Sequence, residues 1–308
     1  MTERAVEVGS VGIAGLGLIG CSVALALRDD GFAARFVGWD RDVHVVAQAR
    51  EAGIIDAACD SLAALAQEVD LLVVATPTLA AEAVLAELLQ LAQAGGAAPW
   101  ITDVASVKGP LCRLAAAAPA SVSGRFVPGH PIAGSERSGV TAADGNLFRE
   151  HRVILTPLEH TLADGVALVS AMWSCAGAEV VELPVDEHDA VLAATSHLPH
   201  AVAFALVNAL ARSERSSDIF RFAAGGFRDF TRIASSDPVM WRDVSIANAP
   251  ALLEAMDSFA QQLGELRDAV AAGDAHALEQ TFRAAKRARD EFANDLRARQ
   301  RRHTGSGS

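Results

Sequence analysis

The sequence is poor in two features that would indicate other classes of protein. It has only four cysteines, Cys21, Cys59, Cys112 and Cys175, and none of them lies in a C-x-x-C pair. A zinc ribbon or a disulfide framework is therefore disfavoured, and we expect buried, reduced thiols. Basic residues number 26 against 38 acidic ones, which gives a formal net charge of -12. Because nucleic-acid binding depends on clustered cations, this balance predicts a small-molecule ligand and no nucleic-acid partner.

Long uninterrupted apolar runs are also missing, since none approaches the ~20 residues that a membrane span requires. The first residues, MTERAVEVGSVGIAG, enter a strand without the basic, apolar and cleavage segments of a signal peptide. We therefore expect a cytoplasmic protein with no membrane partner. A hydrophobic content of 51% and a length of 308 residues describe a globular chain that is long enough for two domains. Residues 304–308, which end in GSGS, are expected to form a flexible tail.

Short β-branched segments alternate with alanine- and leucine-rich segments from Val11 to about Leu183. This alternation is typical of βαβ units and predicts a mostly parallel sheet. The expected strands are SVGIAG, ARFVGWD, DLLVVAT, PWITDVA, GRFVPG, HRVILTP and AEVVEL. We therefore predict an α/β Rossmann-type dinucleotide-binding domain over residues 1–183.

After Pro184 the sequence favours helices only, and it predicts an all-helical substrate and dimerisation domain over residues 184–303. Gly273 and Asp274 are expected to act as a helix stop and an N-cap within an antiparallel helical hairpin. Such long alanine- and leucine-rich helices cannot all cover one small core, so we expect a homodimer. The expected helices are Asp186 to about Arg212, Pro238–Asn248, Pro250–Ala272 and Ala275 to about Arg301.

A glycine turn follows the first expected strand, where VGIAGLGLIG places Gly15, Gly17 and Gly20 before an apolar helix. The first glycine permits a tight turn, the second lets the backbone approach a pyrophosphate, and the third lets helix pack on strand. The first helical residues, Leu18 and Ile19, would bring the positive helix N-terminus to the phosphates. This arrangement predicts an NAD(P) site.

Asp40 ends the next expected strand, about 20 residues beyond the glycine turn, where a carboxylate can accept both ribose hydroxyls. It would repel a 2'-phosphate, so NAD is favoured over NADP, although the neighbouring Arg41 leaves NADP possible. Thr76 and Pro77 follow the third strand and Asp103 ends the fourth, at the carboxyl edge of the sheet where such ligands lie.

Three later segments, TDVASVK, PGHPIAGSERSG and SHLPH, carry polar groups in apolar surroundings. His130 is a candidate base because imidazole titrates near neutrality, and the alternative is a histidine that only stabilises its turn. His197 and His200 lie three residues apart, so both can face one side of a helix that Pro199 interrupts. We expect them to orient a substrate, with core packing as the alternative. No carboxylate or cysteine set completes a metal site beside them, so no metal is predicted.

The segment GGFRDFTRIASSDPVMW contains Arg228, Asp229, Arg232 and Trp241. A guanidinium in this segment can hold a substrate carboxylate through two parallel hydrogen bonds. The residue types alone favour a plainer interpretation, in which Arg228 or Arg232 forms an exposed ion pair with Asp229.

Together these segments resemble the prephenate/arogenate dehydrogenase family of tyrosine biosynthesis. The likeness runs in order through GLGLIG, DVASVK, GHPIAGSE, SHLPH and FRDFTRIASSDPxxW, from Gly15 to Trp241. The resemblance implies oxidative decarboxylation of prephenate or arogenate. In that reaction His130 takes the proton of the C4 hydroxyl, hydride passes from C4 to NAD(P), and carbon dioxide leaves C1 as the ring becomes aromatic.

The same resemblance assigns roles around His130. Ser106 would help to place the hydroxyl and the imidazole as a second catalytic residue. His200 would orient the substrate and Arg232 would hold its ring carboxylate. The remaining expected substrate-binding residues are His197, Ser135, Glu136 and Trp241.

Two other functions stay open. A β-hydroxyacid-dehydrogenase-like enzyme would share the glycine turn and a helical second domain. Members of that group have in common the use of a lysine, and the only lysines of this sequence are Lys108 and Lys286. A catalytically silent NAD-binding regulator would not need His130, Ser106 and Arg232 together. The motifs also leave open whether prephenate or arogenate is preferred.

Overall fold

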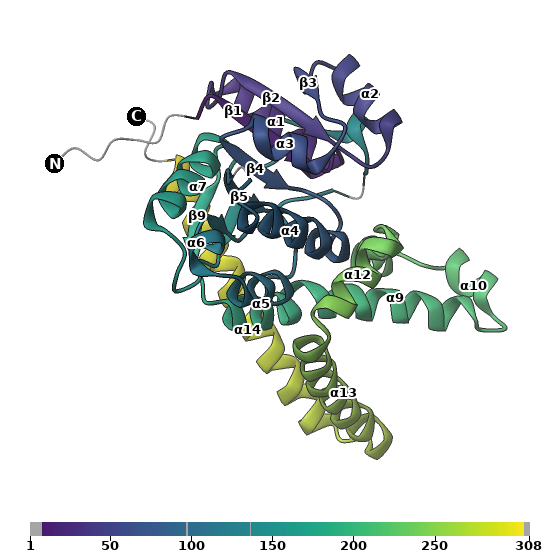
Figure 1. The fold of residues 1–308 in the computed structure, drawn as a ribbon. Coiled ribbons are helices and arrows are strands. Elements are labelled where there is room, and N and C mark those ends of the chain that lie inside the picture. The colour runs from purple at the N-terminus through teal and green to yellow at the C-terminus, as the bar shows by residue number, and fades with distance from the viewer. Residues whose placement is uncertain (1–7, 97, 136, 305–308) are drawn as a thin grey trace. The chain divides into compact units, whose positions relative to one another are not determined.

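The computed structural model describes residues 8–304 except Ala97 and Glu136. The chain divides between Leu252 and Leu253 into two compact units. The first unit holds both β-sheets and all helices up to α12 (Figure 1), and the second holds most of α13 and all of α14. The predicted domain boundary between residues 183 and 184 remains a prediction. In the structure this position lies between the last strand and the helices that follow it.

Six parallel strands form the main sheet in the order β3-β2-β1-β4-β5-β6. The order changes direction between β1 and β4, and a dinucleotide binds in the crevice at the carboxyl end of such a switch point. This topology confirms the predicted Rossmann-type domain. The strands are β1 (Ser10–Ala14), β2 (Arg35–Trp39), β3 (Ala57–Ala58), β4 (Leu71–Val74), β5 (Trp100–Asp103) and β6 (Phe126–Val127).

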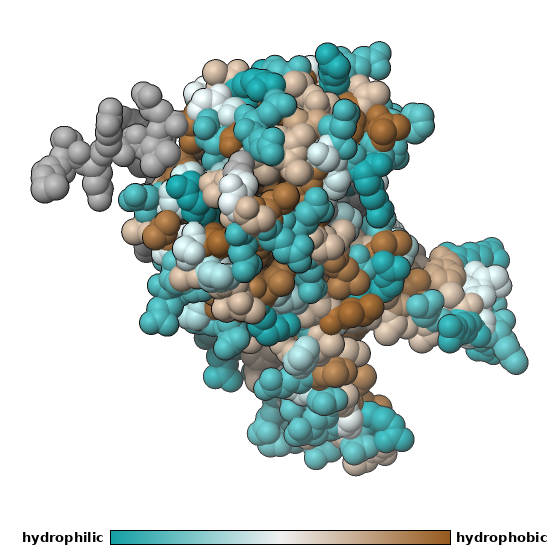
Figure 2. All heavy atoms as spheres, viewed as in Figure 1, coloured by the Kyte–Doolittle hydropathy of each residue, from teal (hydrophilic) through white to brown (hydrophobic). Residues whose placement is uncertain are grey.

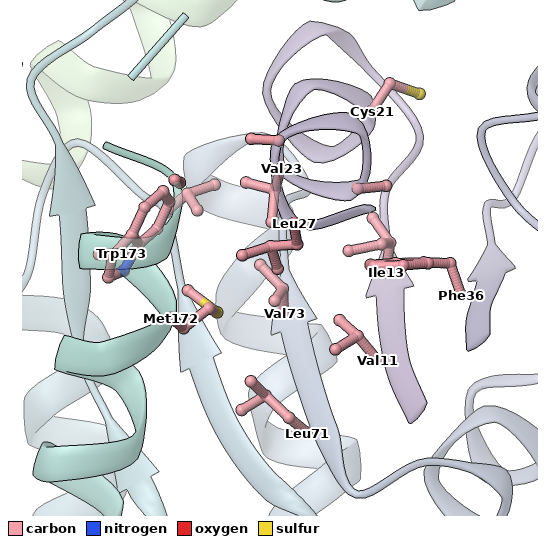
Figure 3. Close-up of a cluster of buried hydrophobic side chains, with 14 of the residues drawn as sticks. Val11, Ile13, Cys21, Val23, Leu27, Phe36, Leu71, Val73, Met172 and Trp173 are labelled. Carbon is pink, nitrogen blue, oxygen red and sulfur yellow. The ribbon is translucent and has the colours of Figure 1, made fainter. Parts of the chain in front are cut away.

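Helices cover both faces of this sheet, because its central strands are apolar on both sides. Ile13 and Val73 pack with Trp173 of α7 and with α1 in one buried cluster, shown in Figure 3. Val74 points the other way, since successive strand residues alternate, and packs with Leu85 of α4. The helices of this part are α1 (Leu18–Asp29), α2 (Val43–Glu51), α3 (Leu62–Glu68), α4 (Thr78–Gln93), α5 (Gly109–Ala117), α6 (Ala120–Ser123) and α7 (Ala163–Cys175).

A second sheet of three strands follows, made of β7 (Gly129–Pro131), β8 (Arg152–Leu155) and β9 (Glu179–Glu182). β7 runs antiparallel to β8, and β8 runs parallel to β9. The expectation that all seven predicted strands belong to one mostly parallel sheet was therefore wrong for the last two. An apolar run such as RVIL predicts a buried strand but does not say which sheet the strand joins. A short 3-10 turn, η1 (Val140–Ala142), lies between β7 and β8.

After β9 the described residues form helices only, as predicted. Gly273 has a φ of +63° where α13 ends, and Asp274 Oδ1 accepts the Ala277 N–H at 2.9 Å, which confirms the expected stop and cap. The elements are α8 (Val185–Leu192), the π-helical turn η2 (Ala193–His197), α9 (Leu198–Ala211), α10 (Ser216–Arg221), α11 (Gly225–Thr231), the 3-10 turn η3 (Arg232–Ser235), α12 (Pro238–Ala247), α13 (Ala249–Ala272) and α14 (Ala275–Thr304).

One helical stretch, Val185–Ala211, is long and apolar enough to cross a membrane by length and composition, with a mean hydropathy of 1.6. The sequence criterion of an uninterrupted apolar run did not detect it. A core helix of a globular protein passes the same test, so length and composition alone assign no membrane to it. Only 22% of its most apolar window is buried in the single chain, and Figure 2 shows further hydrophobic side chains at the surface around α12. An apolar helix with so little burial has a face that more protein can cover.

The cysteines behave largely as predicted. Cys21, Cys59 and Cys112 are buried, Cys175 is half-buried, and all four are free thiols. Burial raises the pKa of Cys21 and of Cys112 to about 12, so neither of these two is a reactive thiolate at neutral pH.

Candidate active site

The glycine turn after β1 combines two positions fixed by packing with one that faces open space. Gly15 has a φ of +102°, and a Cβ there would lie 2.6 Å from the Ala75 carbonyl. A Cβ at Gly20 would lie 2.1 Å from the Gly15 carbonyl oxygen, whereas one at Gly17 would meet nothing within 4 Å. The turn therefore packs tightly against the end of β4 and leaves room at Gly17, where a pyrophosphate approaches the N-terminus of α1.

Two polar side chains at this edge fit a dinucleotide. Asp40 Oδ2 accepts the Leu16 N–H and Oδ1 accepts the Asp42 N–H, both at 2.9 Å. The carboxylate is thus held beside the turn, and each oxygen keeps a lone pair for a ribose hydroxyl. Thr76 Oγ1 is buried with no hydrogen-bond partner among the described residues. Such an orphaned atom costs about 1–3 kcal/mol, which a bound ligand can recover.

Asp103, predicted at the cofactor edge, is 1% exposed and bonds within the chain. Its Oδ2 accepts the Ala105 N–H at 2.9 Å and the Lys108 ammonium, and its Oδ1 accepts the Gly129 N–H at 3.2 Å. Lys108 Nζ also donates to the Gly129 carbonyl at 2.6 Å. These bonds tie the end of β5 to the start of β7, which carries His130. A contact between the Asp103 carboxylate and a cofactor would require one of these hydrogen bonds to break.

His130 is 7% exposed and is the first member of a row of three side chains. Its Nδ1 lies 2.9 Å from Nε2 of His188, and Nδ1 of His188 lies 2.8 Å from Oδ1 of Asp189. Asp189 in turn accepts the backbone N–H groups of Lys108 at 2.9 Å and Gly109 at 2.8 Å. The row therefore runs from β7 through α8 to the N-terminus of α5, where a negative charge is stabilised.

The electrostatics of this row favour a neutral base beside a charged carboxylate. Burial lowers the pKa of His130 well below its ordinary value, and the positive charge of Lys108 lowers it further. The imidazole is therefore unprotonated at neutral pH, as a proton acceptor requires. Burial alone would raise the pKa of Asp189, but the hydrogen bonds from His188 and from two backbone N–H groups outweigh it and hold that pKa below its ordinary value.

The π-helical turn η2 ends at His197, inside the SHLPH segment, and is followed by Pro199 in the first turn of α9. Pro199 has no N–H to donate in a regular helix, and wide turns of this kind are frequent at functional sites. The turn brings His197 and His200 to one aromatic side chain, Trp241. Its ring centroid lies 3.6 Å from that of His200, in a stacked pair, and 6.1 Å from that of His197.

His197 is joined to the row of His130 through Asn248. The Asn248 Nδ2 amide donates to Nδ1 of His197 at 3.1 Å and to the Asp189 carbonyl at 2.8 Å. Burial lowers the pKa of His197 to about 4, so this ring is neutral and holds its hydrogen on Nε2. The two groups of histidines therefore belong to one site.

His200, Arg232 and Trp241 line the other part of this site. Burial lowers the pKa of His200, and the positive charge of Arg232 lowers it further, so the two side chains lie near each other. Trp241 Nε1 is buried without a hydrogen-bond partner among the described residues. An aromatic ring, neutral imidazoles and a guanidinium suit a small ring that carries a carboxylate. No group of three or more metal-ligating side chains occurs in the described part of the chain.

The other predicted residues are placed as follows. Ser106 is half-buried in the loop between β5 and α5, and Ser135 is exposed in the loop after β7. Glu136 lies outside the described residues. Arg228 and Asp229 form an ion pair at 3.3 Å with side chains 82% and 74% exposed, which confirms the plainer interpretation for Arg228.

Three polar residues of this site were missed by the sequence analysis: His188, Asp189 and Asn248. His188 is fully buried and Asn248 is 3% exposed. The only signal available was a histidine–aspartate pair near the start of an acidic helix, where acidic residues are expected simply because they favour a helix N-terminus.

The fold and the site together define a dinucleotide-linked oxidoreductase. The family model described as "Prephenate dehydrogenase, nucleotide-binding domain" matches residues 23–182, and the one described as "Prephenate dehydrogenase, dimerization domain" matches residues 184–284. The chain belongs to the prephenate dehydrogenase family.

Curated relatives and solved structures agree with this assignment. The chain is 39% identical to prephenate dehydrogenase of Bacillus subtilis, covering 90% of this chain and 74% of that protein. It is 36% identical to cyclohexadienyl dehydrogenase of Zymomonas mobilis, covering 92% and 96%. Aquifex aeolicus prephenate dehydrogenase, solved with hydroxyphenyl propionate and NAD+, superposes with a TM-score of 0.85 at 34% identity, covering 94% of this chain and 100% of that one.

The glycine turn predicts that two substitutions separate folding from cofactor binding. Gly20→Ala forces a Cβ onto the Gly15 carbonyl, so it should lower the free energy of unfolding by about 1–3 kcal/mol or more. Gly17→Ala has room for its Cβ and should leave the melting temperature near that of the wild type. It should weaken NAD binding by at least ~10-fold, or about 1.4 kcal/mol, because the methyl group occupies the pyrophosphate approach. Melting curves and NAD titrations check both, and unchanged NAD affinity in Gly17→Ala would place the pyrophosphate elsewhere.

Proposed function

We propose that this protein catalyses the NAD-linked oxidative decarboxylation of prephenate, of arogenate or of both. The observation that carries the proposal is His130, a buried and neutral imidazole on β7, joined through Asp189 and Asn248 to the cluster of His197, His200, Trp241 and Arg232. A base, an aromatic wall and a cation are the groups that a hydroxylated, carboxylated ring needs.

In this proposal His130 accepts the proton of the C4 hydroxyl, and Ser106 helps to place that hydroxyl. NAD supplies, when bound, the two-electron acceptor for the oxidation at C4. Carbon dioxide leaves C1 with its bonding electrons passing into the ring, which becomes aromatic, so the reaction is effectively irreversible. The protein needs chiefly to position C4 and to exclude water, and the burial of His130 serves both.

The other site residues keep the roles predicted for them. Arg232 holds the ring carboxylate and His200 orients the ring, while His197, Ser135 and Trp241 complete the pocket. The role of Glu136 rests on the sequence resemblance alone. On the cofactor side we assign the phosphate turn to Gly15, Gly17, Leu18, Ile19 and Gly20, the ribose to Asp40 and Arg41, and the adjoining edge of the sheet to Thr76 and Pro77. Asp103 is buried at this edge with its oxygens bonded to Ala105, Lys108 and Gly129, so we assign it to holding β7 at the end of β5.

The main alternative is an enzyme that uses a lysine, and the surroundings of the chain's two lysines oppose it. Lys108 is fully buried and bonds to Asp103 and Gly129. Lys286 lies in the second compact unit and pairs with Asp290. The ammonium group of Lys108 is therefore engaged within the chain, and that of Lys286 forms an exposed ion pair within its own helix.

Initial rates test the proposed activity directly. The rise in NADH absorbance is measured with prephenate and with arogenate, each with NAD and with NADP, and we expect turnover with at least one substrate and a preference for NAD. His130→Asn should retain NAD binding and lower kcat at least ~100-fold, the usual contribution of a positioned base. No turnover of either substrate would overturn the proposed function, and near-normal turnover in His130→Asn would remove His130 as the base.

A pair of arginine variants tests the carboxylate site. Arg232→Ala should raise KM for the substrate at least ~10-fold, since a charge-assisted hydrogen-bonded pair contributes about 1.5–3 kcal/mol. Arg228→Ala is the matched control, because its side chain is 82% exposed and pairs only weakly with Asp229. If the two variants have the same KM, Arg232 does not bind the carboxylate.

We also propose that the protein is a homodimer and acts in the cytoplasm. A family model for a dimerization domain covers residues 184–284, and the curated relatives are named prephenate dehydrogenase and cyclohexadienyl dehydrogenase. Within α13, large apolar side chains recur at helical spacing along one side and are exposed in the single chain; they are Leu253, Met256, Phe259, Leu263 and Val270. A stripe of this kind is typical of a helix that packs against another subunit.

Light scattering tests the dimer with two charge insertions on α13. Leu263→Glu puts a carboxylate into the apolar stripe and should shift the molar mass towards that of the 32.1 kDa monomer. Ser258→Glu adds the same charge on another side of the helix and should leave the dimer intact. A monomeric wild type, or equal masses for the two variants, would contradict this interface.

A further inference from the structure

The hydrogen positions along the row of His130, His188 and Asp189 follow from its charged end. Asp189 is an acceptor only, because it is ionised and two backbone N–H groups already point at its oxygens. Nδ1 of His188 must therefore carry the hydrogen that faces Oδ1 of Asp189. With one hydrogen on each ring, the lone pair of His188 lies on Nε2, 2.9 Å from Nδ1 of His130. The hydrogen between the two rings belongs to His130.

We propose that His188 and Asp189 are positioning residues that hold His130 in the tautomer with hydrogen on Nδ1, so that Nε2 is the atom that takes the substrate proton. The inference rests on the proposed role of His130 as the base. Both residues act through His130. The opposite arrangement, in which a protonated His188 donates to Nδ1 of His130, would put the hydrogen of a neutral His130 on Nε2 and leave that atom without a lone pair.

The row is anchored on three separate elements, so it fixes orientation as well as hydrogen position. β7 carries His130, α8 carries His188 and Asp189, and the N-terminus of α5 holds the carboxylate. His188 is fully buried, and its ring meets that of His130 edge to face, with centroids 5.1 Å apart and planes at 65°. His130 therefore cannot rotate about its side-chain bonds without breaking the row.

Charged and titratable groups from the surrounding elements also face the row. Asp103 ends β5 and forms an ion pair with Lys108, which follows that strand. His197 of η2 is neutral. Arg113 of α5 lies near Asp189, because an atom added at Gly109 would touch both side chains. When His130 takes a proton, its Nδ1–H still donates to His188, and the charge of Asp189 stabilises the resulting imidazolium as in a serine-protease triad.

Kinetics of paired variants test this role. His188→Leu removes the acceptor that faces Nδ1 of His130, so kcat should fall at least ~100-fold while the affinity for NAD is unchanged. His188→Gln can present its side-chain oxygen to the same atom and should recover at least about tenfold of that loss, or ~1.4 kcal/mol in activation free energy. His160→Leu is the matched control: His160 also bonds through a ring nitrogen, at 2.9 Å to Ser123 Oγ, but its partner belongs to α6 and not to the row. Equal kcat in His188→Leu and His188→Gln would overturn the proposal.

The pH dependence gives a second readout that a purely structural role would not move. Asp189→Asn removes the anion that stabilises protonated His130, so the pKa of His130 falls. The acidic limb of kcat/KM should therefore shift to lower pH, with a reduced plateau, while the His160→Leu limb stays in place. A limb that does not move, or that moves to higher pH, would contradict the role of Asp189.

Nuclear magnetic resonance of ¹⁵N-histidine-labelled protein observes the tautomer without any turnover. The signals of His130 are identified by their loss in His130→Asn, and we expect hydrogen on Nδ1 in the wild type and a shift towards the Nε2–H form in His188→Leu. A wild type with hydrogen on Nε2 overturns the inference even if the enzyme is active. If the enzyme turns over neither substrate, the proposed function fails while the tautomer result still decides this inference.

Discussion

The ammonium group of Lys108, buried between β5 and β7, is the interaction on which the site depends. Its Nζ binds Asp103 and the Gly129 carbonyl, which joins the edge of the nucleotide-binding sheet to the strand that carries His130. The backbone N–H of Lys108 donates to Asp189, which lies in the helical part of the same unit. A buried ammonium without these partners would be costly, so the pair and its hydrogen bonds hold or fail together. One residue thus links the cofactor edge, the base and the row behind it.

The site divides its histidines between two tasks. His130 and His188 are arranged around the negative charge of Asp189, while His197 and His200 surround the aromatic face of Trp241. Asn248 connects the two groups through one amide nitrogen. Because burial keeps His130, His197 and His200 neutral, these side chains offer lone pairs and ring faces, and the positive charge near His200 comes from Arg232.

The parts of this protein that were predictable are those whose cause is local in the sequence. The glycine turn is one, since a Cβ at Gly20 would meet the Gly15 carbonyl of the same turn, and Gly15 itself has a φ of +102°. The row behind His130 was not predictable, because its bonds join residues 58 and 80 positions apart and depend on how β7, α8 and α5 are packed. For the same reason, the antiparallel pairing of β7 could not be distinguished from another parallel strand. Motif order indicated the family, but packing assigns the neighbours of each motif residue.

The π-helical turn η2 makes the length of its segment as important as its composition. A regular helix advances 100° for each residue, so removing one residue from Ala193–His197 would rotate everything after it by that angle relative to α8. His188 and Asp189 would keep their places, whereas His200 and Trp241, which both follow the turn, would rotate away from them. Substitutions in this turn change one side chain each, but a single deletion would separate the half of the site that accepts a proton from the half that holds the ring. The spacing between Asp189 and His200 is therefore a constraint on insertions and deletions that no single-residue comparison would reveal.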